Sequence, residues 1–112
     1  MGPTLSTKNI QRLSELLRFT PELDDLAARL AITANPTRLR IFYILAELKE
    51  VCVCDIADIL GVTVSAVSQH LAKFKALGLV TTRRDAQTLY YALSAHPFNQ
   101  VFKGSLLAGV EV

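Results

Sequence analysis

Residues 54–77 constrain the fold of this 112-residue chain more than any other stretch. Apolar residues recur there at spacings of three and four, which is typical of two short amphipathic helices. Gly61 separates the two helices, because glycine tolerates the left-handed conformation that ends a helix. Thr63 supplies the hydroxyl of an N-cap for the second helix. We therefore predict a helix-turn-helix unit, with residues 64–77 as the recognition helix that enters the major groove of DNA.

The predicted recognition helix has one apolar face and one polar face. The spacing places Val64, Val67, Leu71 and Phe74 in a buried stripe. Polar side chains are left on the outer face, where they can contact base edges and phosphates. These candidate DNA-binding residues are Ser65, Ser68, Gln69 and Lys73.

A β-hairpin is predicted directly after the recognition helix. The apolar period changes from near four to near two after Gly78, with β-branched and aromatic runs at residues 79–84 and 89–93. We predict a wing at about residues 79–93, whose Arg83, Arg84 and Gln87 lie along the DNA backbone or in the minor groove. The expected fold class is mainly α with a small β-hairpin wing, a winged helix-turn-helix.

The remaining sequence predicts four more helices. Proline follows a capping residue at Thr20-Pro21 and at Asn35-Pro36, a pattern that begins helices. We expect helices at residues 7–18, 21–34 and 36–48, and a last helix capped by Ser94. Residues 1–19 are interpreted as an N-terminal arm with an extra helix. Residues 20–112 are interpreted as the winged helix-turn-helix domain for DNA binding and dimerisation.

Composition favours a homodimer that binds DNA. The chain is 51% hydrophobic, and apolar stripes at residues 23–34 and 98–110 exceed what a small monomer covers. An intramolecular core is the alternative for the first stripe. The net charge is +2, and residues 61–112 carry five basic and two acidic side chains. This basic excess suits phosphate contacts, although an ordinary solvated face would also account for it.

Several function classes lack their sequence signatures. No run of 18 apolar residues is present, so we expect no membrane span. No signal peptide is evident, so we expect a cytoplasmic protein with reduced thiols. The sequence contains no glycine-rich phosphate loop, no H-E-x-x-H motif and no Ser/His/Asp set in a local catalytic context. We therefore expect neither an enzyme nor an organic cofactor.

Cys52 and Cys54 are the candidate metal ligands. They are the two cysteines of the chain and form a C-x-C pair at a predicted helix start. Two thiolates at this spacing can face one soft ion, and a helix N-terminus is expected to lower their pKa. The alternative is that each cysteine acts as a small buried apolar residue.

Four segments together resemble the ArsR/SmtB family of metal-responsive repressors. Residues 34–41 resemble that family's ADPTRLRIL segment, with asparagine in place of aspartate. Residues 50–55 resemble its ELCVCDL metal box, and residues 65–71 resemble its S-x-V-S-x-H-L recognition helix. The Gly78-Leu79-Val80 segment with Arg83 and Arg84 resembles the start of its wing. The resemblance covers about residues 21–110.

The resemblance implies a homodimeric repressor that leaves double-stranded operator DNA when an ion binds Cys52 and Cys54. As(III) or Sb(III) is the favoured ion, and Hg(II), Cd(II) or Pb(II) is the alternative. His70 matches the histidine of the family's recognition helix and joins the candidate DNA-binding residues, with a role in packing as the alternative.

The chain departs from each known ligand set of that family. The third cysteine of arsenite-sensing members corresponds to Ala57 here. The N-terminal arm has no cysteine of the kind that members sensing cadmium or lead use. Of the zinc ligands on the last helix, His96 alone matches. Two alternatives therefore stay open: a regulator of the same fold that responds to thiol oxidation or to a partner protein, and a winged-helix module for protein interaction.

Overall fold

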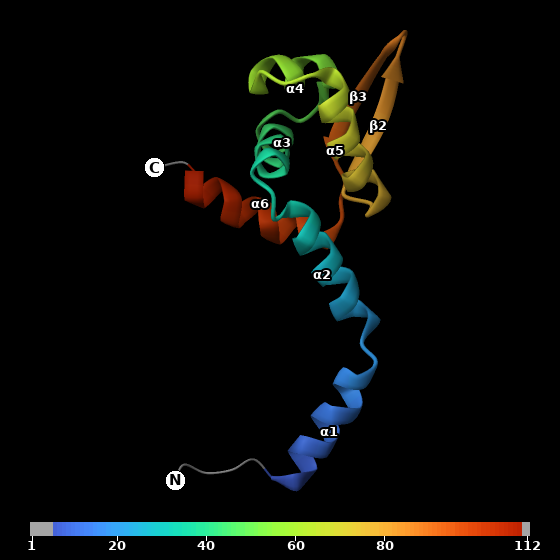
Figure 1. Cartoon of the computed structure of the whole chain (residues 1–112), viewed down its shortest axis with the longest axis vertical. Coiled ribbons are helices and arrows are strands. Elements are labelled where there is room, and N and C mark those ends of the chain that lie inside the picture. The colour runs from blue at the N-terminus through green and yellow to red at the C-terminus, as the bar shows by residue number, and fades with distance from the viewer. Residues whose placement is uncertain (1–5, 111–112) are drawn as a thin grey trace.

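The computed structural model describes residues 6–110. Residues 1–5, the start of the predicted N-terminal arm, and residues 111–112 lie outside the described part. The described chain folds as helices with a small sheet at one side, in the order of a winged helix-turn-helix (Figure 1). The elements are α1 (Thr7–Arg18), α2 (Pro21–Thr33), α3 (Pro36–Glu47), β1 (Val51–Cys52), α4 (Val53–Leu60), α5 (Val64–Ala76), β2 (Val80–Asp85), β3 (Thr88–Leu93) and α6 (Pro97–Val110).

Two of the predicted helix starts have a side-chain cap, whereas the Thr20 hydroxyl donates to the Leu16 carbonyl oxygen and does not cap α2. Asn35 Oδ1 accepts a hydrogen bond from the Arg38 backbone N–H at 3.0 Å, and Pro36 opens α3. Thr63 Oγ1 accepts from the Ala66 backbone N–H at 3.1 Å and caps α5. Gly61 has φ 67° and ends α4 in the left-handed region. The turn between α4 and α5 is therefore confirmed.

The cap predicted for the last helix is wrong. Helix α6 begins at Pro97, three residues after Ser94. The Ser94 hydroxyl instead donates to the Gly78 carbonyl oxygen at 2.6 Å. The Phe98 backbone N–H donates to His96 Nδ1 at 3.0 Å, so the imidazole of His96 takes the place of the cap.

The wing belongs to a three-stranded antiparallel sheet. Its strand order is β1-β3-β2, so β3 is the central strand. Residues 80–85 of β2 pair with residues 88–93 of β3, as the hairpin prediction requires. The two-residue strand β1 pairs Val51 with Tyr91 and Cys52 with Tyr90. The sequence pattern does not predict β1, because two residues carry no periodicity.

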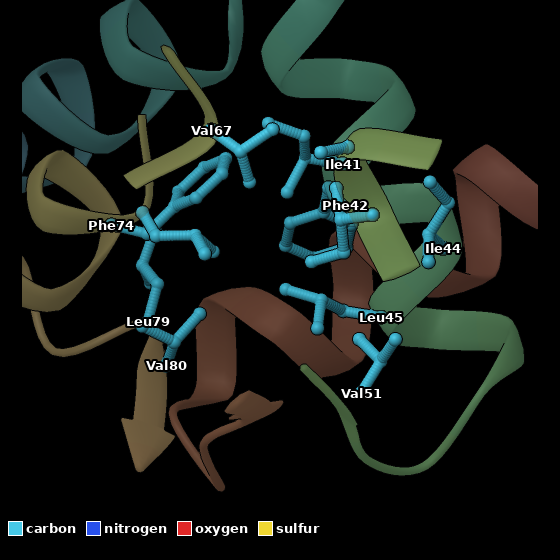
Figure 2. Close-up of a cluster of buried hydrophobic side chains, with 12 residues drawn as sticks. Ile41, Phe42, Ile44, Leu45, Val51, Val67, Phe74, Leu79 and Val80 are labelled. Atoms are coloured by element: carbon cyan, nitrogen blue, oxygen red, sulfur yellow. The ribbon is translucent and has the colours of Figure 1, made fainter. Parts of the chain in front are cut away.

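The core lies where α3, α5, α6 and the base of the wing meet. Phe42 of α3 is 0% exposed and meets two aromatic rings edge-on. Its ring centroid lies 6.3 Å from that of Phe74 and 4.9 Å from that of Phe102. Figure 2 shows Val67 of α5 and Leu79 next to the wing in the same cluster.

Some apolar side chains of the helices remain exposed. Val64, predicted in the buried stripe of α5, is 50% exposed because it stands at the first position of the helix. Helix α1 has no buried residue and projects from the rest of the described chain (Figure 1). Along residues 6–110, no helix is long and apolar enough to cross a membrane.

Candidate metal centre and nucleic-acid surface

The two cysteine sulfurs meet at the junction of β1 and α4. Cys52 is the last residue of β1 and the N-cap residue of α4, and Cys54 is the second residue of that helix. Their Sγ atoms lie 3.0 Å apart and share a hydrogen bond. Cys52 is buried and Cys54 is exposed. The pair thus has one sulfur fixed in the protein and one sulfur accessible to solvent.

Asp55 adds a carboxylate to the cysteine pair. One oxygen of Asp55 and the two sulfurs lie within 4.8 Å of one another, and the Asp55 side chain is exposed. Within residues 6–110, this is the one group of three potential metal-ligating side chains. We did not predict Asp55 as a ligand from the sequence, although its position directly after the C-x-C pair was a usable signal. His96 is not part of this group.

The thiol of Cys52 is held in its protonated form. Its hydrogen bond with Cys54 raises the pKa of Cys52, and burial and the nearby Asp55 carboxylate also raise it. The backbone N–H of Asp55 acts in the opposite direction. The amide at the helix N-terminus therefore acts in the expected direction, but the neighbouring thiol, burial and the carboxylate outweigh it, so the net shift of this pKa is upward and not downward as expected. An ion that binds here must displace the proton, so its affinity depends on pH.

An ion pair joins the segment before Cys52 to the wing. Arg83 Nε donates to Glu50 Oε2 at 2.9 Å, and Arg83 Nη2 donates to Glu50 Oε1 at 2.6 Å. The guanidinium carbon of Arg83 lies 4.9 Å from the centroid of the Tyr90 ring. The hydrogen bonds between Glu50 and Arg83 lower the pKa of Glu50 and raise the pKa of Arg83. Arg83, a predicted DNA contact, is therefore engaged within the chain.

Helix α5 presents the polar face that the sequence predicts. Its buried side rests on the core through Val67, Leu71 and Phe74. Thr63 and Gly61 fix where the helix begins, and so fix which side chains point outward. The exposed residues on the outer face are Ser65, Ser68, Gln69 and Lys73.

His70 lies between the outer face of α5 and α3. It is half-buried, and Arg38 Nη1 lies 3.4 Å from its Nδ1 atom. Burial lowers the pKa of His70, and the charges of Arg38 and Lys73 lower it further. A neutral imidazole at this position braces the recognition helix against α3. Its role as a DNA contact remains a prediction.

The tip of the wing carries the other predicted DNA contacts. Arg84 is exposed near the end of β2, and Gln87 is exposed in the turn between β2 and β3. Ala86 occupies that turn with φ 56°. Neither side chain makes a hydrogen bond within residues 6–110, so both are available to a ligand outside the chain.

A second surface feature is an apolar groove between α2 and α6. Its volume is about 440 Å³. Leu26 and Leu30 of α2 are 42% and 47% exposed there, and Val101 of α6 is 76% exposed. Phe98 and Phe102 form the floor, where their rings stack at 5.2 Å. The two apolar stripes predicted from the sequence therefore meet along one groove.

Comparison with known protein families and curated proteins gives one consistent result. The family model described as "Bacterial regulatory protein, arsR family" matches residues 35–82. The nodulation protein NolR of Rhizobium meliloti is 48% identical over 69 residues, which are 62% of this chain and 56% of that protein. A cadmium resistance transcriptional regulatory protein CadC homolog of Staphylococcus aureus is 32% identical over 79% of this chain and 73% of that protein. The arsenical resistance operon repressor of Escherichia coli is 40% identical over 58% and 56%.

Solved structures of similar proteins extend the match to the whole fold. HlyU from Vibrio cholerae superposes with a TM-score of 0.75, at 32% identity, over 82% of this chain and 98% of that one. NolR from Sinorhizobium fredii has a TM-score of 0.69 at 36% identity over 98% and 97%. The homodimeric winged helix-turn-helix DNA-binding domain of Mb0332 from Mycobacterium bovis has a TM-score of 0.71 at 30% identity over 81% and 83%.

Proposed function

Because this chain belongs to the ArsR family of bacterial regulatory proteins, we propose that it is a transcriptional repressor that binds operator DNA as a homodimer. We further propose that a soft thiophilic metal or metalloid ion, bound at Cys52 and Cys54, releases it from DNA. Members of this family are transcriptional regulators rather than enzymes. The chain spans only 56% of the length of two of the curated relatives, so their specific ligands do not transfer directly.

The exposed polar face of α5 supports the DNA-binding part of the proposal. Ser65, Ser68 and Gln69 read base edges in the major groove, since hydroxyl and amide groups offer both donors and acceptors. Lys73 and the wing residue Arg84 neutralise phosphates and give affinity without sequence preference. Gln87 lies beside Arg84 at the wing tip and adds a backbone contact.

The groove between α2 and α6 supports the homodimer. Leu26, Leu30 and Val101 leave apolar surface in water that a second copy of the same groove would cover. A two-fold axis at this groove would hold two recognition helices at a fixed spacing, which a palindromic operator requires. The similar domain of Mb0332, which is homodimeric, agrees with this arrangement.

The cluster of Cys52, Cys54 and Asp55 is the single observation that supports the proposed ion sensor. Two sulfurs 3.0 Å apart and an adjacent carboxylate form a donor set that is partly open to solvent. Soft thiolates select thiophilic ions over Mg²⁺ or Ca²⁺. The carboxylate of Asp55 suits a divalent ion such as Cd(II), whereas As(III) or Sb(III) would complete its set with an external thiol or water. Relatives named for cadmium resistance and arsenical resistance agree with both ion classes.

Release of a promoter fragment, measured by fluorescence anisotropy, tests both parts. Cys52→Ser and Cys54→Ser should each bind the chain's own promoter like the wild type and fail to release it when Cd(II), As(III) or Hg(II) is added. Asp55→Asn should reduce the response to Cd(II) more than the response to As(III). Gln69→Ala should lose roughly 1–3 kcal/mol of preference for the operator over other sequences.

Each part of the proposal has its own refuting result. Ion-driven release of the double serine variant at wild-type concentrations would show that the cysteines are not the sensor. Wild-type sequence preference in the Gln69→Ala variant would show that α5 does not read base edges through that residue.

The short distance between the two sulfurs favours thiol oxidation as a second candidate signal. An oxidised sulfur on the exposed Cys54 would lie next to the thiol of Cys52. Release of DNA by peroxide with no metal ion present, reversed by a reducing agent, would identify thiol oxidation as the signal. Release of DNA by an ion under fully reducing conditions would identify metal binding as the signal.

A further inference from the structure

The Glu50–Arg83 ion pair ties the wing to the strand that carries Cys52. Glu50 lies directly before β1, two residues from Cys52. The sheet pairs Cys52 with Tyr90, and Tyr90 with Arg83. Paired residues on neighbouring strands stand on the same face. One row of side chains therefore runs across the sheet from the cysteine pair to β2.

This ion pair is built for position rather than for stability. Two parallel N–H···O bonds fix the orientation of the Arg83 guanidinium, which also lies over the Tyr90 ring. The side chains are 54% and 37% exposed, and pairs this open to solvent add little to the free energy of unfolding. The two hydrogen bonds therefore fix the position of Arg83 relative to Glu50 but add little to the stability of the protein. A contact that couples the wing to the cysteine segment needs this combination.

We propose that Glu50, Arg83 and Tyr90 are positioning residues that transmit the state of the cysteine pair to the wing. This inference rests on the proposed function, because it takes the cysteine pair as the sensor. It assigns Arg83 a role different from the phosphate contact that the sequence suggests.

The hydrogen bond between the two thiols is the contact through which ion binding would act on β1. Cys52 belongs to β1 and Cys54 to α4, so the spacing of their sulfurs sets the position of the strand against the helix. An ion bound by both sulfurs would replace this hydrogen bond and would hold the two sulfurs at a different spacing. Strand β1 then shifts against α4. The ion pair makes β2 and β3 follow β1, so the wing moves relative to α5, which packs on α4.

Apart from the ion pair, the wing is joined to the sensor by the packing of α4 against β3 and by the pairing of β3 with β1. Val51 and Cys52 are the whole of that strand. Removal of the Glu50 carboxylate should therefore weaken the coupling of the wing to the cysteines while leaving both sites folded. Hydrogen exchange of the ion-free protein should show faster exchange at the paired amides of β1 and β3 in Glu50→Gln, with α5 unchanged.

A double-mutant cycle of Glu50→Gln and Arg83→Gln tests the inference on the full-length protein. The measured quantity is the ratio of DNA dissociation constants with and without added Cd(II). Each single variant should reduce this ratio by roughly fivefold or more, since typical couplings are 5–150-fold. In the double variant, this ratio should fall no further than it does in either single variant. Cd(II) affinity of the DNA-free proteins, measured by thiolate charge-transfer absorbance, should stay at the wild-type value.

Two matched controls separate the ion pair from general charge effects. Glu47→Gln removes an exposed carboxylate near Glu50 and should leave the ratio unchanged. Arg84→Gln removes the neighbouring wing cation and should weaken DNA binding equally with and without Cd(II).

Three results would overturn the inference. The first is a wild-type ratio in Glu50→Gln. The second is additive losses in the double variant, which would place Arg83 on a phosphate independently of Glu50. The third is a wild-type protein that no thiophilic ion releases, and this result alone would also remove the proposed sensor.

Discussion

Replacement of Ala57 by cysteine would place a third sulfur one helical turn after Cys54. Residues three apart on a helix have Cβ atoms about 5–6 Å apart, so the new thiol lies within reach of the existing pair. Ala57 is 4% exposed and belongs to the core cluster around Ile56 and Leu71. The added sulfur therefore enters a packed region and must rotate outward to meet an ion.

The expected effects of Ala57→Cys on stability and on ion affinity have opposite signs. Overpacking a core position costs about 1–3 kcal/mol of the free energy of unfolding. A third thiolate completes the donor set of a trigonal ion, so As(III) affinity should rise by about 10–100-fold, equal to about 1.4–2.8 kcal/mol. Affinity for Hg(II), which two thiolates satisfy in a linear arrangement, should change little. The ratio of As(III) to Hg(II) affinity is therefore the sensitive quantity.

Thiolate charge-transfer absorbance during As(III) and Hg(II) titrations measures this ratio and the number of sulfur ligands. Ala57→Ser is the matched control, because it adds an atom at the same place without a thiolate. Urea unfolding of both variants reports the packing cost. A folded Ala57→Cys protein whose As(III) affinity and sulfur count equal those of the wild type would refute the reasoning, since position 57 would then not face the cysteine pair.

Two further predictions concern assembly and pH. Leu26→Asp and Val101→Asp alter exposed residues of the groove between α2 and α6. Each variant should be a folded monomer with poor operator affinity. A wild-type protein that sediments as a monomer at micromolar concentration would contradict this prediction. Because burial and nearby cations lower the pKa of His70 below its ordinary value of 6.5, the unfolded chain binds the proton first as the pH falls. The free energy of unfolding should therefore decrease as the pH drops through 6.5, and His70→Gln should flatten this slope in urea titrations; an unchanged slope would show that His70 titrates normally.

The sequence by itself determined most helices, the hairpin of the wing and the outward face of the recognition helix. Local rules suffice for these features, because a cap at Thr63, a left-handed Gly61 and an apolar repeat act within a few residues of themselves. The hairpin at residues 80–93 was predicted for the same reason. The C-x-C pair also required no long-range information, since a single residue separates its two cysteines in the chain.

The tertiary structure decided how the sensor segment meets the wing. Strand β1 exists only because β3 pairs with it, and Glu50 meets Arg83 across 33 positions of sequence. No local pattern encodes either contact. The sequence therefore assigned Arg83 to DNA as a free cation, and the structure engages it with Glu50.

The same distinction explains the pKa of Cys52 and the buried Asn99. A helix N-terminus predicts a lowered thiol pKa, but the neighbouring thiol and carboxylate raise it, and their distances depend on side-chain packing. Asn99 lies in an apolar helix and is 1% exposed, because its Nδ2 group donates to the carbonyl oxygens of Leu79 and Ser94. Local propensity acts along the chain, whereas burial and charge act through space, and only the folded chain sets the distances on which they depend.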